Sequence, residues 1–463
     1  MREYLWYIVC AVACLVVLVV LWPSEAGSPE EKAALAEGRV VITYWDRHTG
    51  HEYEARVKLI EEFNRSQNQV YVRTLPIGSR IEKLLTAIAG GAPPEICSLE
   101  TAVLAALASQ GCFTPLEDFM AAEPYLNEEK FFPHVWAMVR FDGHVWAVPT
   151  TTDSTCLLWN KGAFRRAGLD PDRPPRTLNE LEEYAAKLTV RSPNGMVEQI
   201  GFLPWLPWDV THMWGCLFGG KWYDPATKRV VCGNDPGIIA SLAWQQTFAV
   251  NPASRENPPH AIDPTMVSAI PGGGFGEYQS ASNPFYTGKV AMITEGEWQV
   301  EFTRKYAPDL DWGVAPIPQP EGAPPVAYSP NAVVDAIPVG SKNEEAAKVF
   351  LRWFYSPRPN GGASPASDYN YDIQNIPPRR EEAMQERFTG HPKFRVFVEQ
   401  LLTKPAEPYP AIPAMQLMSD DMERQRGYVT LYKITPEDAA HNIEADTNTE
   451  LERVAKVRGR AAR

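Results

Sequence analysis

The chain has 463 residues, of which 44% are hydrophobic and 22% charged, so it is long enough for two domains and too apolar to be disordered over most of its length. Its 57 acidic residues outnumber 44 basic ones and give a net charge of −13, which disfavours a nucleic-acid partner because phosphate binding needs clustered Lys and Arg. The 42 prolines and 14 tryptophans predict long, shaped loops and aromatic surfaces.

The chain begins with an apolar segment. Residues 4–22 form an uninterrupted apolar run that follows Arg2 and ends before Pro23. Pro23 and the Ser24-Glu25-Ala26 pattern are typical of a signal peptide cleaved after residue 26. As a helix the same run would span about 28 Å, which suits an uncleaved membrane anchor. The sequence leaves this choice open, and either alternative predicts that the body is exported to the periplasm or to the outer face of the cytoplasmic membrane.

After a polar spacer expected over 27–38, predicted strands and helices alternate. Strands are expected at 40–45, 70–75 and 95–99, where apolar and β-branched residues dominate. Helices are expected between them, because apolar residues recur on one helical face within 53–63 and 81–89. This alternation predicts an α/β fold with a parallel sheet, since parallel strands need long crossover connections. Such sheets bind ligands beyond the carboxyl ends of their strands.

The second part of the chain has a different texture. Between about 150 and 330, loops rich in Pro, Gly and Trp separate helices expected at 178–188 and 238–248. Residues 356–378 are polar and rich in Pro, Gly and Asn, which predicts a loop. Two helical stretches are expected after it. The five cysteines beyond the apolar run are an odd number, and the sequence leaves open whether Cys97 pairs with Cys112 and Cys216 with Cys232.

Seven local strings, in chain order, resemble the landmarks of the extracellular sugar-binding proteins of ABC importers, which form family 1 of the bacterial solute-binding proteins and include maltose-binding protein. The strings are ITYWDRHTGHEYEARVKLIEEFNRSQNQVYV, LLTAIAGGAPPEICSLE, LASQGCFTPLEDF, FDGHVWAVPTTTDSTCLLWNKGAFRRAGL, TGKVAMITEGEWQV, WGVAPIPQPEG and NAVVDAIPVGSKNEEAAKVFLRWF. The likeness spans about residues 40–355. It implies a two-lobed periplasmic-binding-protein fold in which hinge crossings join the lobes.

Carried over by position, the resemblance divides the chain between the lobes. Lobe one is expected to hold 39–150 and 333–386, and lobe two 151–332 and 387–463. The expected crossings lie near 150–153, 331–333 and 386–391. Between the lobes, the resemblance implies a cleft lined by Trp45, Asp46 and Arg47 after the first strand, either Glu95 or Glu100 around the third, Thr152 and Asp153 in PTTTDS, and Trp298 at the end of TEGEW.

The chemistry of a sugar explains why such residues are expected to bind it. A pyranose has apolar C–H faces that stack on flat aromatic rings and a rim of hydroxyls that charged groups bind strongly. Trp205 and Trp208 lie in a Pro-rich loop and are added to the expected site on this ground, whereas Trp214 and Trp222 are expected in a core. Each of these aromatic and charged residues also has an ordinary structural alternative, in the core or on the solvated surface.

The predicted function is therefore extracytoplasmic binding of a mono- or oligosaccharide between the lobes and its delivery to the permease of an ABC importer, with no catalysis, cofactor or metal. An exported carbohydrate-active enzyme is the main alternative, with Glu295 and Glu297 as its carboxylates. In a strand these two share a face and lie too close for the roughly 5–9 Å separation that glycosidases use. A membrane-tethered sugar sensor is the third class, and it is disfavoured because only three residues precede the apolar run.

Overall fold

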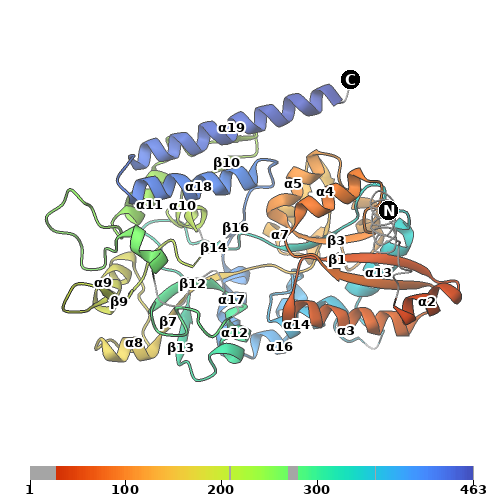
Figure 1. Ribbon diagram of the computed structural model, residues 1–463, viewed down its shortest axis with the longest axis horizontal. Helices are drawn as coiled ribbons and strands as arrows, with labels where there is room; N and C mark the ends of the chain where they lie inside the picture. Colours follow the sequence, from red (N-terminus) through yellow and green to blue (C-terminus); the bar gives the residue numbers. More distant parts are fainter. Residues whose placement is uncertain (1–27, 208–209, 270–279, 360, 462–463) are drawn as a thin grey trace, which may run out of the picture.

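The computed structural model describes residues 28–207, 210–269, 280–359 and 361–461. The chain forms two lobes, each with its own sheet and its own cluster of buried apolar side chains (Figure 1). Lobe one is the body around the sheet that contains β1 (Val40–Asp46), and lobe two is the body around β7 (Thr155–Asn160). The expected two-lobed α/β architecture is confirmed.

The sheet of lobe one has the strand order β2-β1-β3-β15-β6. The predicted alternation of three strands and two helices is confirmed: β1 pairs in parallel with β2 and β3, and the two helices connect them. β15 runs antiparallel to both of its neighbours, so the sheet is mixed. Its elements are β1, α3 (Gly50–Ser66), β2 (Val70–Pro76), α4 (Ile81–Ala89), β3 (Ile96–Glu100), β6 (Val148–Pro149) and β15 (Val333–Ala336).

The stretch expected to be a spacer is mostly a helix, α2 (Pro29–Ala36). The Ser28 hydroxyl accepts a hydrogen bond from the Glu31 backbone N–H at 3.2 Å, and Pro29 occupies the first turn, where no N–H is needed. Arg73 of β2 pairs with the Glu31 carboxylate at 3.1 Å and so attaches the helix to lobe one. The helix-start signal of Ser28 and Pro29 therefore predicts the structure of this segment better than its polar composition does.

Further helices pack on lobe one. They are α5 (Thr101–Ser109), α6 (Glu117–Ala122), the 3-10 turn η1 (Glu128–Lys130), α7 (Pro133–Val139), α13 (Glu344–Tyr355) and α14 (Pro365–Ile373), with the hairpin β4 (Arg140–Phe141) and β5 (His144–Val145). The prediction that 356–378 is a loop is wrong over α14. Ser364 caps that helix by accepting a hydrogen bond from the Ser367 backbone N–H at 3.0 Å, and buried Tyr369 and Ile373 anchor it to the core.

Lobe two is built on the antiparallel sheet β12-β7-β13. The predicted helix at 178–188 is confirmed as α9, and the one at 238–248 lies two residues earlier as α11. Its elements are β7, α8 (Lys161–Arg166), α9 (Leu178–Leu188), β8 (Val190–Arg191), β9 (Val197–Gln199), α10 (Thr211–Leu217), β10 (Tyr223–Asp224), β11 (Arg229–Val230), α11 (Pro236–Gln246), η2 (Pro264–Ala269), β12 (Met292–Gly296), α12 (Gln299–Tyr306), β13 (Trp312–Ala315), α17 (Pro392–Thr403) and β16 (Ala406–Glu407). Between α14 and α17, the short helices α15 (Arg380–Ala383) and α16 (Glu386–Thr389) contact lobe one, where Glu381 pairs with Lys130 at 3.1 Å and Arg387 with Asp368 at 2.7 Å.

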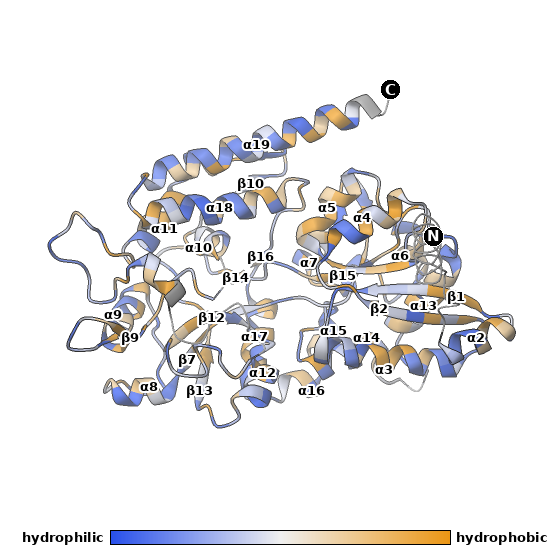
Figure 2. Ribbon diagram, in the orientation of Figure 1, coloured by the Kyte–Doolittle hydropathy of each residue, from blue (hydrophilic) through white to orange (hydrophobic). Residues whose placement is uncertain are grey.

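The expected terminal helices are α18 (Met415–Thr430) and α19 (Pro436–Ala461), which lie along the top of the molecule in Figure 1. They pack on α10 and α11 through a separate apolar cluster that includes Met418, Met422 and Ile443. Most helices carry hydrophobic and hydrophilic residues in turn along their length, as expected for helices with one buried face (Figure 2). The C-terminal pair therefore completes the upper part of lobe two.

Three segments connect the lobes. The first runs from β6 to β7, the second from β14 (Ala327–Tyr328) to β15, and the third follows α14. The Thr150 N–H donates to the Val333 carbonyl at 2.8 Å, and the Thr152 N–H donates to the Ile376 carbonyl at 2.9 Å. The three segments are therefore hydrogen-bonded side by side, and the third joins this bundle at Ile376. The position expected for the third crossing, near 386–391, stays a prediction.

The five cysteines beyond the apolar run are all buried and carry free thiols. Neither of the two pairs left open by the sequence is therefore a disulfide in this structure. The expected signal peptide or anchor lies outside the described residues, and within them no helix has the length and apolar character needed to cross a membrane.

Candidate functional site

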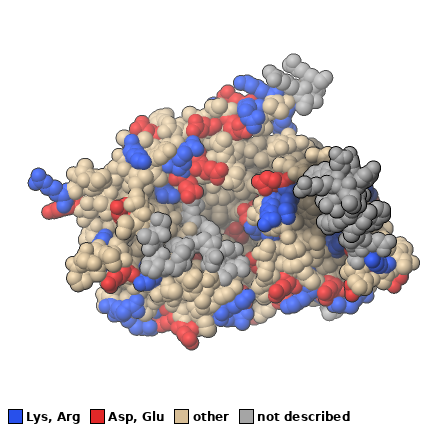
Figure 3. Space-filling view, viewed as in Figure 1, with Lys and Arg blue, Asp and Glu red and all other residues tan. Residues whose placement is uncertain are grey.

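A cavity of about 540 Å³ lies between the lobes. In the space-filling view the surface is recessed there (Figure 3). Its polar and aromatic lining comes from both lobes, from the three crossings and from the C-terminal region: Arg47, His48, Glu52, Ser79, Glu100, Asp153, Thr155, Thr294, Glu295, Trp298, Phe302, Tyr328, Asn331, Asn375, Tyr409, Gln416 and Ser419. We call this cavity the cleft.

The lobe-one wall of the cleft carries an ion pair. Arg47 follows β1 directly, and Glu100 ends β3, so the two lie at the carboxyl ends of neighbouring parallel strands. The Arg47 guanidinium donates to the Glu100 carboxylate. Both side chains remain partly exposed to the cleft, so the pair presents hydrogen-bonding groups to a ligand.

A buried charge network supports this wall. Asp46 is fully buried, and its carboxylate accepts the His48 backbone N–H at 2.9 Å and pairs with Arg56 at 3.4 Å. Burial raises the pKa of Asp46, but the hydrogen bond and charge of His48 together with Arg56 outweigh burial, so the pKa lies below its ordinary value. The Arg56 guanidinium lies over the Tyr369 ring at 4.0 Å from its centroid. The network fixes the turn that carries Arg47.

The lobe-two wall is centred on Trp298. Its indole N–H donates to the Glu295 carboxylate at 2.8 Å, and the Gln299 side-chain amide donates to the same carboxylate oxygen at 3.2 Å. A Cβ on Gly296 would lie 2.3 Å from the Trp298 ring, so only glycine allows the indole to lie against the backbone there. The ring is therefore held in one orientation at the cleft.

A second aromatic group continues this wall. Tyr328 and Tyr409 line the cleft, and the Tyr328 hydroxyl lies 3.2 Å from His212 Nδ1. The His212 ring stacks on Trp222, with centroids 5.5 Å apart. Burial lowers the pKa of His212 to about 3, so this imidazole is neutral at physiological pH.

Acidic groups crowd the floor of the cleft. Burial raises the pKa of Asp153 to about 8, and the negative charge of Glu100 adds to this rise while Arg47 opposes it. Glu297 lies beneath the floor, fully buried, and accepts the Ser154 backbone N–H at 2.9 Å. Its pKa is raised well above the usual range by burial and by the nearby Asp153. Glu297 is not among the lining residues, whereas Glu295 is.

Four of the residues expected in the site come together in the cleft: Arg47, Glu100, Asp153 and Trp298. For the acidic position left open by the sequence, the cleft holds Glu100. Glu95 instead accepts the Thr43 backbone N–H at 2.7 Å.

The other expected residues lie elsewhere. Trp45 packs half-buried on the core of lobe one, and Asp46 points from β1 into the charge network. Thr152 is buried in the first crossing, within 3.1 Å of His134 and Ser329, and Trp205 is 7% exposed in the core of lobe two. The placement of Asp46 follows from β-strand alternation, which sends neighbouring residues to opposite faces, and that of Trp205 follows from its apolar surroundings. Trp208 lies outside the described residues.

The sequence interpretation did not include Tyr328, Asn331, Asn375, Tyr409, Gln416 or Ser419. Asn331 could have been added from the sequence, because the second crossing is expected near 331–333, which includes it. Gln416 and Ser419 lie on α18, far along the chain, and no local pattern marks them as cleft residues. Among the described residues, no group of three or more His, Cys, Asp or Glu side chains is placed to hold a metal ion.

Comparison with known proteins gives one family. Residues 49–360 match the family described as bacterial extracellular solute-binding proteins. A curated relative, the sn-glycerol-3-phosphate-binding periplasmic protein UgpB of Escherichia coli strain K12, is 24% identical over 397 residues, which is 81% of this chain and 83% of that protein. The homologous protein of Salmonella typhimurium strain LT2 is 25% identical over 286 residues, 60% of each chain.

Solved structures share the fold. CpMnBP1 with mannotriose bound superposes with a TM-score of 0.74 and 28% identity, covering 88% of this chain and all of the other (100%). A solute-binding protein of Thermotoga lettingae bound with α-D-tagatose gives a TM-score of 0.71 and 21% identity over 89% of this chain and 100% of the other. Because its sequence identity is only 21%, the Thermotoga lettingae protein shows a similar fold and nothing further.

Proposed function

The chain belongs to the family of bacterial extracellular solute-binding proteins, and we propose that it binds a mono- or oligosaccharide in the cleft and delivers it to the permease of an ABC importer. The observation that carries the carbohydrate assignment is Trp298, whose indole lines the cleft while its N–H is held by Glu295 at 2.8 Å. An aromatic ring held in this way offers its face to the C–H face of a pyranose.

The polar groups around Trp298 suit the rim of the same sugar. Arg47 and Glu100 offer a charged donor and a charged acceptor, and such groups bind hydroxyls more strongly than neutral ones do. Asp153 adds a carboxyl group that can donate or accept a hydrogen bond. The cleft volume of about 540 Å³ lies within the ~300–1,000 Å³ typical of small-molecule sites. We propose Arg47, Glu100, Asp153 and Trp298 as ligand-binding residues on these grounds.

The charge of the cleft favours a neutral ligand over a phosphate ester. Its described lining includes the carboxylates Glu52, Glu100 and Glu295, the carboxyl group of Asp153 and, as its only Lys or Arg, Arg47. Recognition of phosphate relies on Arg and Lys donors and is opposed by nearby carboxylates. The curated relatives are named for sn-glycerol 3-phosphate, whereas the similar structure at 28% identity is named for bound mannotriose. The charge of the lining supports a neutral carbohydrate as the ligand.

A thermal-shift screen of the full chain tests the assignment. The compounds are mannobiose, mannotriose, maltotriose, tagatose and sn-glycerol 3-phosphate. We expect at least one carbohydrate to stabilise the protein, by about 2.7 kcal/mol at 100 times its dissociation constant. Stabilisation by sn-glycerol 3-phosphate alone would overturn the assignment.

Binding rather than catalysis is the proposed role. Glu295 lines the cleft but Glu297 lies beneath it, which speaks against the two acting as a pair on one glycosidic bond. Incubation with the carbohydrate that binds should therefore release no reducing sugar. Loss of sugar uptake when the protein is deleted from its host would support import, whereas a loss of transcriptional response alone would support a sensor.

We also propose that the body acts outside the cytoplasm, close to the membrane. The proposal rests on the apolar run 4–22 and on the family match. Intact-mass measurement of the membrane and soluble fractions distinguishes an anchored chain that retains residue 2 from a soluble one that begins at Gly27.

A further inference from the structure

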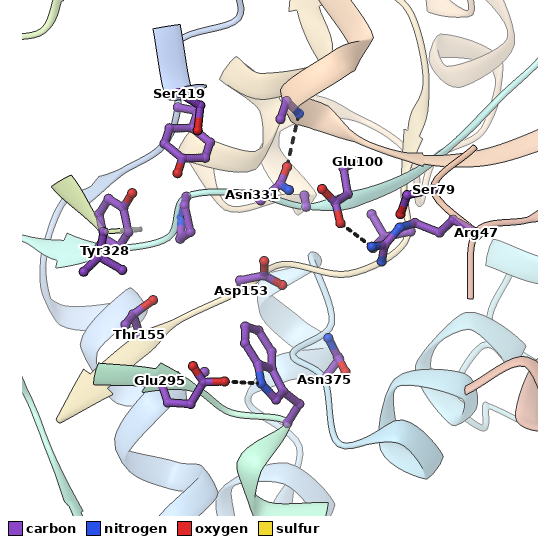
Figure 4. Close-up of a pocket in the computed structure, with 18 of the residues that line it drawn as sticks. Arg47, Ser79, Glu100, Asp153, Thr155, Glu295, Tyr328, Asn331, Asn375 and Ser419 are labelled. Carbon is purple, nitrogen blue, oxygen red and sulfur yellow. Dashed lines mark hydrogen bonds and ion pairs between the residues drawn. The ribbon is translucent and has the colours of Figure 1, made fainter. Parts of the chain in front are cut away.

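Each of the three crossings between the lobes places one polar side chain in the cleft. Asp153 comes from the first crossing, Asn331 from the second and Asn375 from the third. Figure 4 shows the three labelled side chains entering the same pocket from separate segments of the chain. The backbone of the hinge therefore lies within reach of whatever fills the cleft.

The amide of Asn331 already has protein partners. Its Oδ1 accepts the Thr101 hydroxyl at 2.6 Å and the Ala102 backbone N–H at 3.2 Å. Both donors lie at the start of α5, so Asn331 ties the second crossing to lobe one. Its oxygen is satisfied before any ligand arrives.

Asn375 differs from Asn331 in this respect. The residue is only 6% exposed, and among the described residues its Oδ1 is buried without a hydrogen-bond partner. Folded proteins seldom leave a buried acceptor unpaired, because its hydration is lost and nothing replaces it. Asn375 lines the cleft, so a ligand there is placed to supply the missing donor.

The backbone around Asn375 gives its side chain little freedom to turn away. The Asn375 N–H donates to the Asn370 carbonyl at 2.9 Å, and Gln374 adopts a left-handed conformation with φ of 53°. The next residue, Ile376, accepts the Thr152 N–H of the first crossing at 2.9 Å. The amide is therefore presented to the cleft by a backbone that is hydrogen-bonded on both sides.

We propose that Asn375 is a specificity-determining residue that hydrogen-bonds one hydroxyl of the bound carbohydrate, so that a hinge segment itself recognises the ligand. The inference rests on the proposed function. An amide offers an acceptor and two donors and so complements a hydroxyl, which both donates and accepts. Its location in a crossing means that ligand contact and lobe closure involve the same segment, which biases the lobe equilibrium toward the liganded arrangement.

A double-mutant cycle between Asn375→Ala and monodeoxy sugars tests the contact. The probe is the carbohydrate of the screen (mannobiose, mannotriose, maltotriose or tagatose) that stabilises the protein most, together with its monodeoxy derivatives, and the readout is calorimetric affinity. We expect Asn375→Ala to weaken the parent sugar about tenfold. One deoxy derivative should bind the wild type about tenfold more weakly and lose no further affinity in the variant. Asn194→Ala, in the exposed turn between β8 and β9, is the matched control and should bind as the wild type does.

Two outcomes would overturn the inference. Unchanged affinity in Asn375→Ala would mean that the amide does not meet the ligand. An equal loss for the parent sugar and every deoxy derivative would mean that the substitution acts on the hinge and not on a hydroxyl. If the wild-type protein bound none of the carbohydrates, the proposed function would fail, and this inference would fall with it.

Discussion

The two walls of the cleft are built on different principles. On lobe one, Arg47 and Glu100 satisfy each other before a ligand arrives, and the turn that carries them rests on the buried charges of Asp46 and Arg56. On lobe two, the Trp298 ring has one polar group, its N–H, which already donates to Glu295, so the face of the ring remains available for stacking. The first wall is suited to selecting among hydroxyl patterns, and the second to supplying most of the binding free energy.

The supports of the two walls differ in the same way. Beneath lobe one, Arg56 lies between Asp46 and Asp335, with nitrogen–oxygen distances of 3.4 and 3.9 Å, and all three are fully buried. Beneath lobe two, neutral rings pack together around His212. Removing one member of a buried ion network leaves an unpaired buried charge and costs much of the network's stability. Truncating one ring of an aromatic cluster costs only the contacts of that ring. The comparison can therefore be tested by removing one member from each wall.

The largest expected effect is on stability, from Arg56→Met. Removing this guanidinium leaves the buried Asp335 without its counter-ion and Asp46 with His48 alone, which should cost about 3–5 kcal/mol of the free energy of unfolding. Urea unfolding of the full chain measures the loss. Arg65→Met on the same helix is the control, because the Arg65 side chain is 72% exposed, and its loss should change stability by less than about 0.5 kcal/mol. Equal stability of the two variants would show that the network does not support lobe one.

The next effect is on affinity, from Trp298→Ala. Loss of a central aromatic contact typically costs about 2 kcal/mol or more, so we expect at least roughly 30-fold weaker carbohydrate binding by calorimetry. Trp298→Phe is the conservative comparison, because it keeps a ring face but loses the N–H that Glu295 accepts. It should bind between the wild type and the alanine variant. Normal binding by Trp298→Ala, with the fold intact by circular dichroism, would place the stacking surface elsewhere.

The smallest expected effect is on the melting temperature, and it comes from substituting Asp153 on the floor of the cleft. The pKa of Asp153 is raised to about 8 by burial and by the neighbouring Glu100, so folding favours its protonated form. Its contribution to stability is therefore fully present below the unfolded-state pKa, near pH 4, and is lost as pH rises through 8. Asp153→Asn should raise the melting temperature at pH 9 and have little effect at pH 4. A pH-independent difference would indicate that burial and neighbouring charge do not set this pKa.

Local patterns predicted lobe one well. Alternating strand and helix patterns over 40–99 led to the correct elements, and the meeting of parallel strand ends placed Arg47 and Glu100 near each other. The same reasoning could not tell Asp46 from Arg47, because the two are neighbours and only the pleat decides which one faces the core. The same reasoning wrongly predicted a loop over the whole of 356–378. Its helix α14 depends on the Ser364 cap and on burial against the core, and the polar composition of the segment shows neither.

By itself, the sequence determined the α/β alternation, the family resemblance and the aromatic and charged residues at strand ends, because periodicity and turn signals act over a few residues and leave a local record. Only the tertiary structure decided which of those side chains share a cavity. The cleft joins Arg47 with Asn375 and with Gln416 of α18, both of which lie more than 300 positions after Arg47 in the chain. Such contacts arise when the crossings bring the two lobes together and the C-terminal helices pack on α10 and α11, and no local pattern encodes either event.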